Sequence, residues 1–202
     1  MDKNVRPYKQ RGDTCAISCM MMVLEYFGVM EKANWYDERR LYRAFKSKYM
    51  DGVPFSALCY YFSKNGLNTS IYHSDKELFN NNLNVLDSYD FEHTMDEYKK
   101  YLDIAVKKGL TVQNGVDINS DMIKSKLKEG NLVILAGELN SGIYHAILIS
   151  GYDKNNFYVC DPLYKNKQLK SEDEIEKFMN TLIGKWFISI NDNTKEKQNQ
   201  KN

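Results

Sequence analysis

Cys15 stands where the polar stretch QRGDT meets a long apolar run, a position in which a thiol can act as a nucleophile. A thiolate is stabilised by the exposed amides of a helix N-terminus or by a protonated histidine nearby. Asp13 is a capping residue type and Gly28 is a typical helix stop. The sequence therefore predicts a helix over residues 13–27, with Asp13 as its N-cap and Cys15 in its first turn.

His145 and Asp161 are the candidate partners of this thiol. His145 lies at the start of the apolar segment YHAILIS, which predicts a strand. The sheet would fix the backbone of His145, and its imidazole would lie at the end of the strand. Asp161 ends the next apolar segment, where Pro162 cannot continue a strand ladder and the carboxylate is able to orient an imidazole. Nucleophile, base and orienting carboxylate thus follow one another in the chain.

The hairpin between these two strands sets a geometric condition. If Lys154 and Asn155 form a two-residue turn, residue 161 pairs with residue 148 and its side chain lies on the face opposite to that of His145. A β-bulge, a longer turn or an irregular strand end is then needed to bring the two side chains together.

Each candidate residue also has an ordinary structural interpretation. A buried cysteine packs as a small hydrophobe, and an aspartate before proline is a common turn residue, so only the combination favours catalysis. The other cysteines and histidines are interpreted more simply. We expect core packing for Cys19, Cys59 and Cys160, and solvated side chains for His73 and His93. Cys15 and Cys19 have no second pair of ligand residues at matching spacing, so we expect no metal and no cofactor.

The remaining pattern places helices first and strands later. The helix that carries Cys15 is apolar on every side, so other elements should surround it. Further helices are predicted over residues 34–49, 55–66, 94–109, 119–130 and 171–182, and strands over 67–74, 131–139, 144–152, 156–162 and 185–190. The charged run at residues 37–40 is interpreted as a solvated helix face. We expect an α+β fold in which a central N-terminal helix packs on a C-terminal antiparallel sheet.

Length and composition narrow the function further. A chain of 202 residues suits one domain, expected over residues 1–190, with 75–112 as an inserted segment and 191–202 as a disordered tail. The 28 basic and 27 acidic residues include no long basic stripe, which argues against nucleic acid as a partner. No apolar run reaches the roughly 20 residues of a membrane helix, and four cysteines are too few for a disulfide scaffold. We expect a cytoplasmic protein, and the sequence leaves the oligomeric state open.

Together the motifs resemble the bacteriocin-processing (double-glycine leader) peptidase superfamily of bacterial, papain-like cysteine peptidases. The matching elements are Gln10, Cys15, Tyr26-Phe27-Gly28, His145 and Asp161-Pro162, and the sixteen-position step from His145 to Asp161 is the usual one in that family. The resemblance implies a papain-like fold, a stand-alone member of the family, and a peptide or protein substrate. It also implies that the Gln10 side chain and the Cys15 amide hold an oxyanion. The chain departs from the family pattern in having Ala16 after the cysteine and Gln10 five rather than six positions before it.

Three functions remain open at this point. The first is a cysteine peptidase or amide hydrolase that acts through Cys15, His145 and Asp161 and a thioester, with a leader peptide as a candidate substrate. The second is an acyltransferase or crosslinking enzyme that passes the same thioester to an amine. The third is a catalytically silent module that binds a peptide, which the altered spacing around Gln10 would permit.

Overall fold

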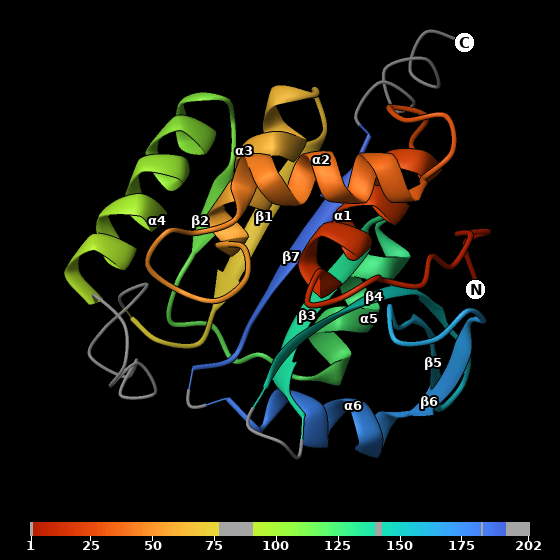
Figure 1. Ribbon diagram of the computed structural model, residues 1–202. Coiled ribbons are helices and arrows are strands. Elements are labelled where there is room, and N and C mark those ends of the chain that lie inside the picture. The colour runs from red at the N-terminus through yellow and green to blue at the C-terminus, as the bar shows by residue number, and fades with distance from the viewer. Residues whose placement is uncertain (1, 77–90, 140–142, 183, 193–202) are drawn as a thin grey trace, which may run out of the picture.

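The computed structural model describes residues 2–76, 91–139, 143–182 and 184–192, and Figure 1 shows the order of its elements. The helices of these ranges are α1 (Cys15–Tyr26), α2 (Trp35–Phe45), α3 (Phe55–Lys64), α4 (Phe91–Lys107), α5 (Ser120–Lys128) and α6 (Glu172–Met179). The strands are β1 (Asn68–His73), β2 (Thr111–Gln113), β3 (Leu132–Glu138), β4 (Tyr144–Tyr152), β5 (Asn156–Cys160), β6 (Gln168–Ser171) and β7 (Trp186–Asn191).

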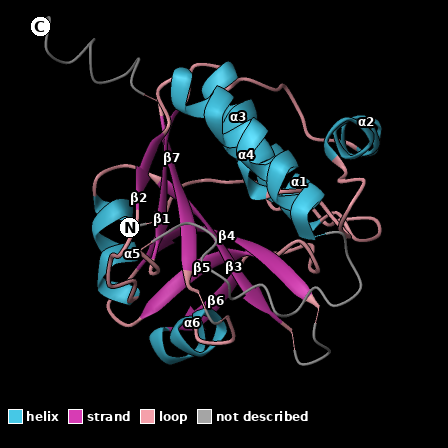
Figure 2. Ribbon diagram, turned by 90° about the vertical axis from the view of Figure 1, so that its left-hand side faces the viewer, coloured by secondary structure: helices cyan, strands magenta, loops and turns pink. Residues whose placement is uncertain are grey.

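The strands form one sheet in the order β2-β1-β7-β3-β4-β5-β6. Every neighbouring pair is antiparallel except β1 and β2, which run parallel. Helices α1 and α3 lie on one face of the sheet, and α5 and α6 lie on the other (Figure 2). The predicted α+β class, with a central N-terminal helix on a largely antiparallel sheet, is confirmed. The prediction of a C-terminal sheet was incomplete, because β1 and β2 come from the first 113 residues.

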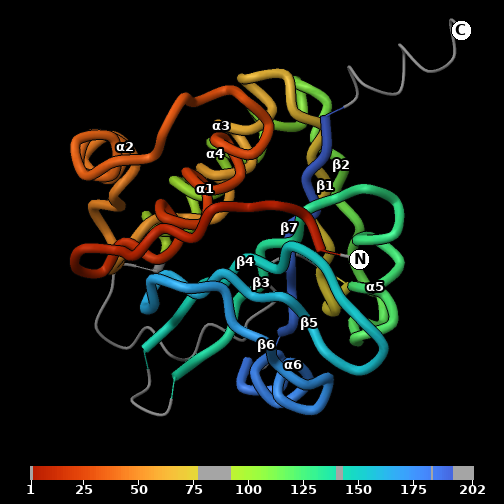
Figure 3. The backbone as a smooth tube through the Cα atoms, turned by 90° about the vertical axis from the view of Figure 1, so that its right-hand side faces the viewer, coloured from red at the N-terminus to blue at the C-terminus, as the bar shows by residue number. Residues whose placement is uncertain are grey.

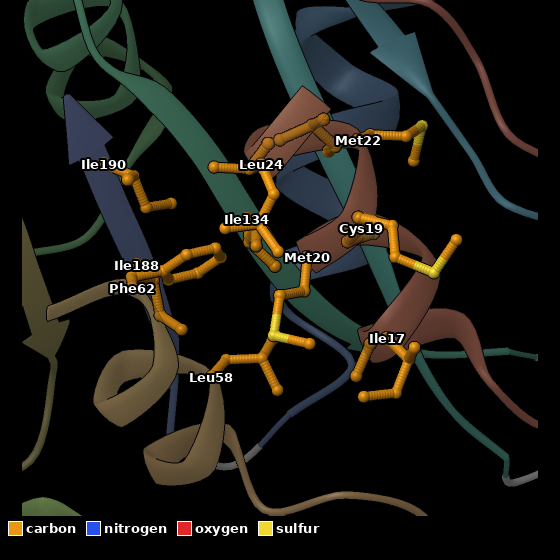
Figure 4. Packing of buried hydrophobic residues seen from close by; sticks show 14 of the residues in the cluster. Ile17, Cys19, Met20, Met22, Leu24, Leu58, Phe62, Ile134, Ile188 and Ile190 are labelled. Atoms are coloured by element: carbon orange, nitrogen blue, oxygen red, sulfur yellow. The ribbon is translucent and has the colours of Figure 1, made fainter. Parts of the chain in front are cut away.

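Helix α1 is the centre of the larger core. Nine of its twelve residues, 16–24, are buried, as expected of a helix that is apolar on every side. Met20 belongs to one continuous hydrophobic cluster with Leu58 of α3 and Ile188 of β7, and Figure 4 shows part of this cluster. Full burial of such side chains contributes about 1.5–3 kcal/mol each, so the axis of α1 is held firmly from several sides.

The start of α1 differs from the prediction. The N-cap is Thr14 rather than Asp13, so the helix begins at Cys15 and the thiol is on its first residue. Asp13 is a common capping residue type, but its side chain is exposed and Thr14 occupies the position before the first helical turn. At the other end, Gly28 has a φ of 75°, the left-handed conformation predicted for the helix stop.

Two short strands were not predicted. β2 and β6 contain three and four residues with little apolar character, and they lie at the two edges of the sheet, where burial does not impose an alternating pattern. Helix α4 lies within the segment 75–112, interpreted from the sequence as an insertion, and β2 begins in this segment and ends one residue beyond it. That interpretation remains a prediction, and residues 77–90 lie outside the described residues. The predicted tail begins within β7, which ends at Asn191, and its residues 193–202 are likewise outside the described part of the chain.

None of the helices in the described ranges combines the length and the apolar character needed to cross a membrane.

Candidate active site

The four cysteines differ in exposure. Cys15 is half-buried, whereas Cys19, Cys59 and Cys160 are fully buried, which confirms their interpretation as core residues. Burial raises the pKa of all three buried thiols, that of Cys160 to about 11. These three side chains are therefore neutral packing groups, and Cys15 alone among the cysteines has access to solvent.

A β-bulge at Ser150 resolves the register problem of the β4–β5 hairpin. Tyr152 and Gly151 pair with the residues expected from a two-residue turn, but Ile149 then pairs with Val159, so that Ser150 is an additional residue in β4. Beyond the bulge Leu148 pairs with Cys160, and position 161 falls opposite 147 instead of 148. Residue 161 therefore has the same alternation as His145, as the proposed pair requires.

The N-terminal segment holds this bulge in place. Asp2 forms an isolated bridge with Gly151 and accepts a hydrogen bond from the Ser150 hydroxyl at 2.9 Å. The amide of Lys3 donates to the carbonyl of Ser150 at 3.1 Å. The backbone groups that a bulge removes from the strand ladder thus find partners, which stabilises the shifted register.

His145 and Asp161 are in direct contact. His145 Nε2 donates to Asp161 Oδ1 at 2.8 Å, and the imidazole is almost fully buried. The amide of Leu163 donates to the same carboxylate oxygen at 2.9 Å, so the turn after β5 fixes the orientation of Asp161. This is the side-chain pair that the sequence predicted, made possible by the bulge.

Cys15 interacts with the same imidazole. Burial alone would lower the pKa of His145, but the neighbouring Asp161 carboxylate, hydrogen-bonded to the ring, and the nearby Cys15 side chain outweigh it and raise the pKa to about 9. Because Nε2 is bound to Asp161, Nδ1 is the ring nitrogen left for the thiol. The structure therefore brings Cys15, His145 and Asp161 together at the N-terminus of α1.

Gln10 lies beside this group but is held by its own loop. Its backbone amide donates to the carbonyl of Pro162 at 2.8 Å, which ties the loop to the turn that carries Asp161. Its side-chain Nε2 donates to the carbonyl of Gly12 at 2.6 Å, and Oε1 is buried with no hydrogen-bond partner among the described residues. A primary amide has two donor hydrogens, so one remains for another acceptor. The oxyanion role of Gln10 stays a prediction.

Glu38 of α2 is a residue of this region that the sequence interpretation missed. Only 1% of its surface is exposed, and its carboxylate accepts from Tyr8 Oη at 2.7 Å, the Arg11 amide at 2.8 Å and Thr14 Oγ1. Glu38 thus holds both ends of the loop that contains Gln10 and leads into Cys15. Burial and the hydrogen bond to Glu38 also raise the pKa of Tyr8.

The prediction that residues 37–40 form a solvated face is therefore wrong for Glu38. A signal was present in the sequence, because Glu38 precedes Leu41 and Phe45 by three and seven positions and these are the other buried residues of α2. A glutamate on the apolar stripe of a helix needs buried partners, but those partners lie 24 to 30 positions earlier in the chain.

The other two histidines lie away from this region and behave differently. His93 is exposed, as predicted, and its ring stacks on Tyr49. His73 was predicted to be solvated, but only 8% of its surface is exposed, because it is the last residue of β1. Its Nδ1 accepts from the amide of Asp75 at 3.0 Å, and burial lowers its pKa. Among the residues that the structure describes, no group of three His, Cys, Asp or Glu side chains could hold a metal ion.

Comparisons with known proteins point to one family. The model of the Peptidase_C39 like family matches residues 2–188. No match was found among curated proteins. One solved structure, described as that of a C39-like peptidase from Bacillus anthracis, is 16% identical over 94% of this chain and 95% of that one, with a TM-score of 0.49. Because the family model spans nearly the whole sequence, the chain belongs to the Peptidase_C39-like family.

Proposed function

We propose that this chain is a cysteine peptidase that cleaves an amide bond through Cys15, His145 and Asp161. The observation that carries the proposal is the 2.8 Å contact between His145 Nε2 and Asp161 Oδ1, with Cys15 near enough to the same imidazole to help raise its pKa. Membership of a peptidase family supports this class of chemistry.

The first half of the reaction makes a thioester. His145 Nδ1 takes the proton of the Cys15 thiol, and the thiolate attacks the carbonyl carbon of the scissile bond. The Cys15 amide, exposed at the first residue of α1, and the Gln10 side chain hold the oxyanion that forms. When the tetrahedral intermediate collapses, the carbon–nitrogen bond breaks and His145 gives its proton to the leaving amine.

The second half returns the enzyme to its starting state. His145, now neutral, removes a proton from water, and the resulting hydroxide attacks the thioester carbonyl. The carbon–sulfur bond then breaks, releasing a carboxylic acid, and the proton returns to the Cys15 sulfur. Asp161 stays ionised throughout, because its role is to orient the imidazole and to stabilise the imidazolium.

The substrate class follows from the resemblance noted in the sequence. A peptide with small residues at the cleavage site, as in a double-glycine leader, is the first substrate to test. A peptide of this kind should be incubated with the full chain and with the Cys15→Ala variant, and the products weighed by mass spectrometry. The expected result is two fragments whose masses add up to the mass of the intact peptide plus one water, formed only by the unaltered chain.

A chemical test separates this proposal from a silent binding module. Iodoacetamide at about pH 6 should alkylate Cys15 much faster than a free thiol in solution, because a free cysteine is almost entirely protonated there. His145→Gln should remove this advantage, and Lys99→Gln on α4 provides a control for an exposed charge change. Labelling of Cys15 no faster than that of free cysteine would overturn the proposal. Addition of amine nucleophiles, with product masses raised by the amine, would instead support acyl transfer.

A further inference from the structure

The arginines of this chain are confined to one region. All five lie within residues 6–43, although lysines occur throughout the sequence. Arg6 forms a bidentate salt bridge with Glu25 of α1, with two hydrogen bonds of 2.5 and 2.6 Å. The other four meet near the exposed face of α2 and are called here the arginine cluster: Arg11, Arg39, Arg40 and Arg43. Guanidinium groups differ from ammonium groups because they bind carboxylates with two parallel hydrogen bonds and stack on aromatic rings. A surface that carries arginines and no lysines is therefore suited to binding carboxylates.

Trp35 lies at the centre of the cluster. The guanidinium groups of Arg11 and Arg39 lie 5.8 and 5.4 Å from the centre of the Trp35 ring. A shallow groove between side chains, open to solvent, adjoins this stack. Its lining residues all belong to α2: Trp35, Tyr36, Arg39, Arg40, Arg43 and Ala44. Tyr36 is 78% exposed, so an aromatic ring is also available to a partner at this surface.

The chain supplies few anions to balance these charges. Arg40 pairs with Asp37 at 2.9 Å, while Glu38 is turned into the protein and bound to Tyr8 and Thr14. Within the described ranges, Arg39 and Arg43 have no carboxylate within ion-pair distance. They are four positions apart on one helix, where like charges destabilise the helix. A cluster that is unfavourable for the isolated helix becomes favourable when an external anion binds.

One member of the cluster, Arg11, belongs to the loop that leads into the candidate nucleophile. It lies between Gln10 and Cys15, and its backbone amide is bound to Glu38, on the inward side of α2. Figure 3 shows the N-terminal segment passing over α1 and reaching α2 before it turns into α1. A polypeptide that extends from Cys15 across Arg11 would therefore continue onto the outer face of α2.

We propose that the arginine cluster binds an acidic segment of the peptide substrate, close to the scissile bond; this inference rests on the proposed peptidase function. Arg39 and Arg43 are separated by about 6 Å along the helix axis. In an extended peptide, side chains two positions apart on the same side are separated by about 6.6 Å. The best match is therefore a segment with Asp or Glu at alternate positions, each carboxylate bound by one guanidinium group.

Binding can be measured without cleavage. The full chain with Cys15→Ala would be titrated into a fluorescein-labelled peptide that carries a Glu-Ala-Glu-Ala-Glu segment next to a Gly-Gly pair, and into the same peptide with Gln in place of Glu. The double variant Arg39→Gln/Arg43→Gln would be compared with Lys99→Gln/Lys100→Gln. The latter removes the same charge from exposed positions of α4. Thermal unfolding of each variant would show that the fold is retained.

We expect the acidic peptide to bind more tightly than its Gln counterpart, with an affinity that falls as salt is added. Arg39→Gln/Arg43→Gln should weaken this binding at least about tenfold, since it removes two charge-assisted pairs, while the lysine variant should have little effect. Equal binding of the two peptides, or equal effects of the two double variants, would overturn the inference. So would an arginine-dependent preference for a single-stranded oligonucleotide or for anionic lipid vesicles over the acidic peptide.

Two separate measurements distinguish a failure of the acidic-peptide site from a failure of the proposed catalysis. Iodoacetamide labelling of Cys15 reports only on the candidate active site, whereas the titrations use a chain without the thiol. An activated Cys15 with no preference for the acidic peptide would overturn the inference alone. An inert Cys15 with arginine-dependent peptide binding would overturn the proposed catalysis and support the surface as a peptide-binding site.

Discussion

Glu38 on α2 and Thr14, the residue just before the candidate nucleophile, share a hydrogen bond between two buried side chains. This contact, with those from Tyr8 and the Arg11 amide, fixes the loop before α1 to a helix that follows it in the chain. The Cys15 thiol is thus positioned from two sides, by the burial of α1 behind it and by Glu38 beside the loop in front of it.

Replacing Glu38 should therefore affect both stability and Cys15. Glu38→Ala leaves three donors without their acceptor, one of them the buried Thr14 hydroxyl, and we expect it to lower the free energy of unfolding by about 3 kcal/mol. Glu38→Gln keeps the shape and one acceptor, and should cost roughly 1 kcal/mol. Urea unfolding measures both, with Glu31→Ala as an exposed control expected to change stability by less than about 0.5 kcal/mol. Equal stabilities of the Glu38 and Glu31 variants would show that the buried contacts are not important.

The protonation of His145 should make stability depend on pH. Its pKa is raised from 6.5 to about 9 in the folded protein, so the folded state binds the proton more tightly than the unfolded state. The resulting stabilisation is fully present below pH 6.5 and is lost as the pH rises through 9. We expect the difference in unfolding free energy between the unaltered chain and His145→Gln to fall by up to about 3 kcal/mol between about pH 6 and pH 9.5. A difference that is constant or grows with pH would contradict the raised pKa.

Asp161→Asn tests the orienting role of the carboxylate. The amide is nearly the same shape, but it carries no charge to stabilise the imidazolium and can favour the wrong tautomer of His145. The rate of peptide cleavage should fall by roughly 10²- to 10⁴-fold. The pH profile of Cys15 alkylation should also change, because the pKa of His145 decreases when the charge of Asp161 is lost. Asp173→Asn, an exposed site on α6, is the matched control, and a loss of similar size there would show that the effect is not specific.

Much of this arrangement could be predicted from local sequence. Residues 16–24 are apolar on every side of α1, so this helix must be surrounded by other elements. The central position of α1 can be predicted because the apolar pattern is contained in one short segment of the sequence. The contact between the His145 and Asp161 side chains could be predicted only on the condition that the hairpin register shifts. It depends on a bulge at Ser150 that is held by Asp2, a residue 148 positions away. Glu38 was missed for the same reason, since its partners come from the loop before α1.

Gln10→Ala should separate oxyanion stabilisation from activation of the thiol. If the Gln10 side chain holds the oxyanion, its loss should lower kcat for peptide cleavage by about 10²- to 10³-fold with little change in KM. Alkylation of Cys15 by iodoacetamide forms no oxyanion, so its rate should be nearly unchanged. Gln113→Ala, on the exposed edge strand β2, is the control substitution. A parallel loss of cleavage and alkylation in Gln10→Ala would instead indicate that Gln10 supports the loop through Gly12, the contact that it makes in the free protein.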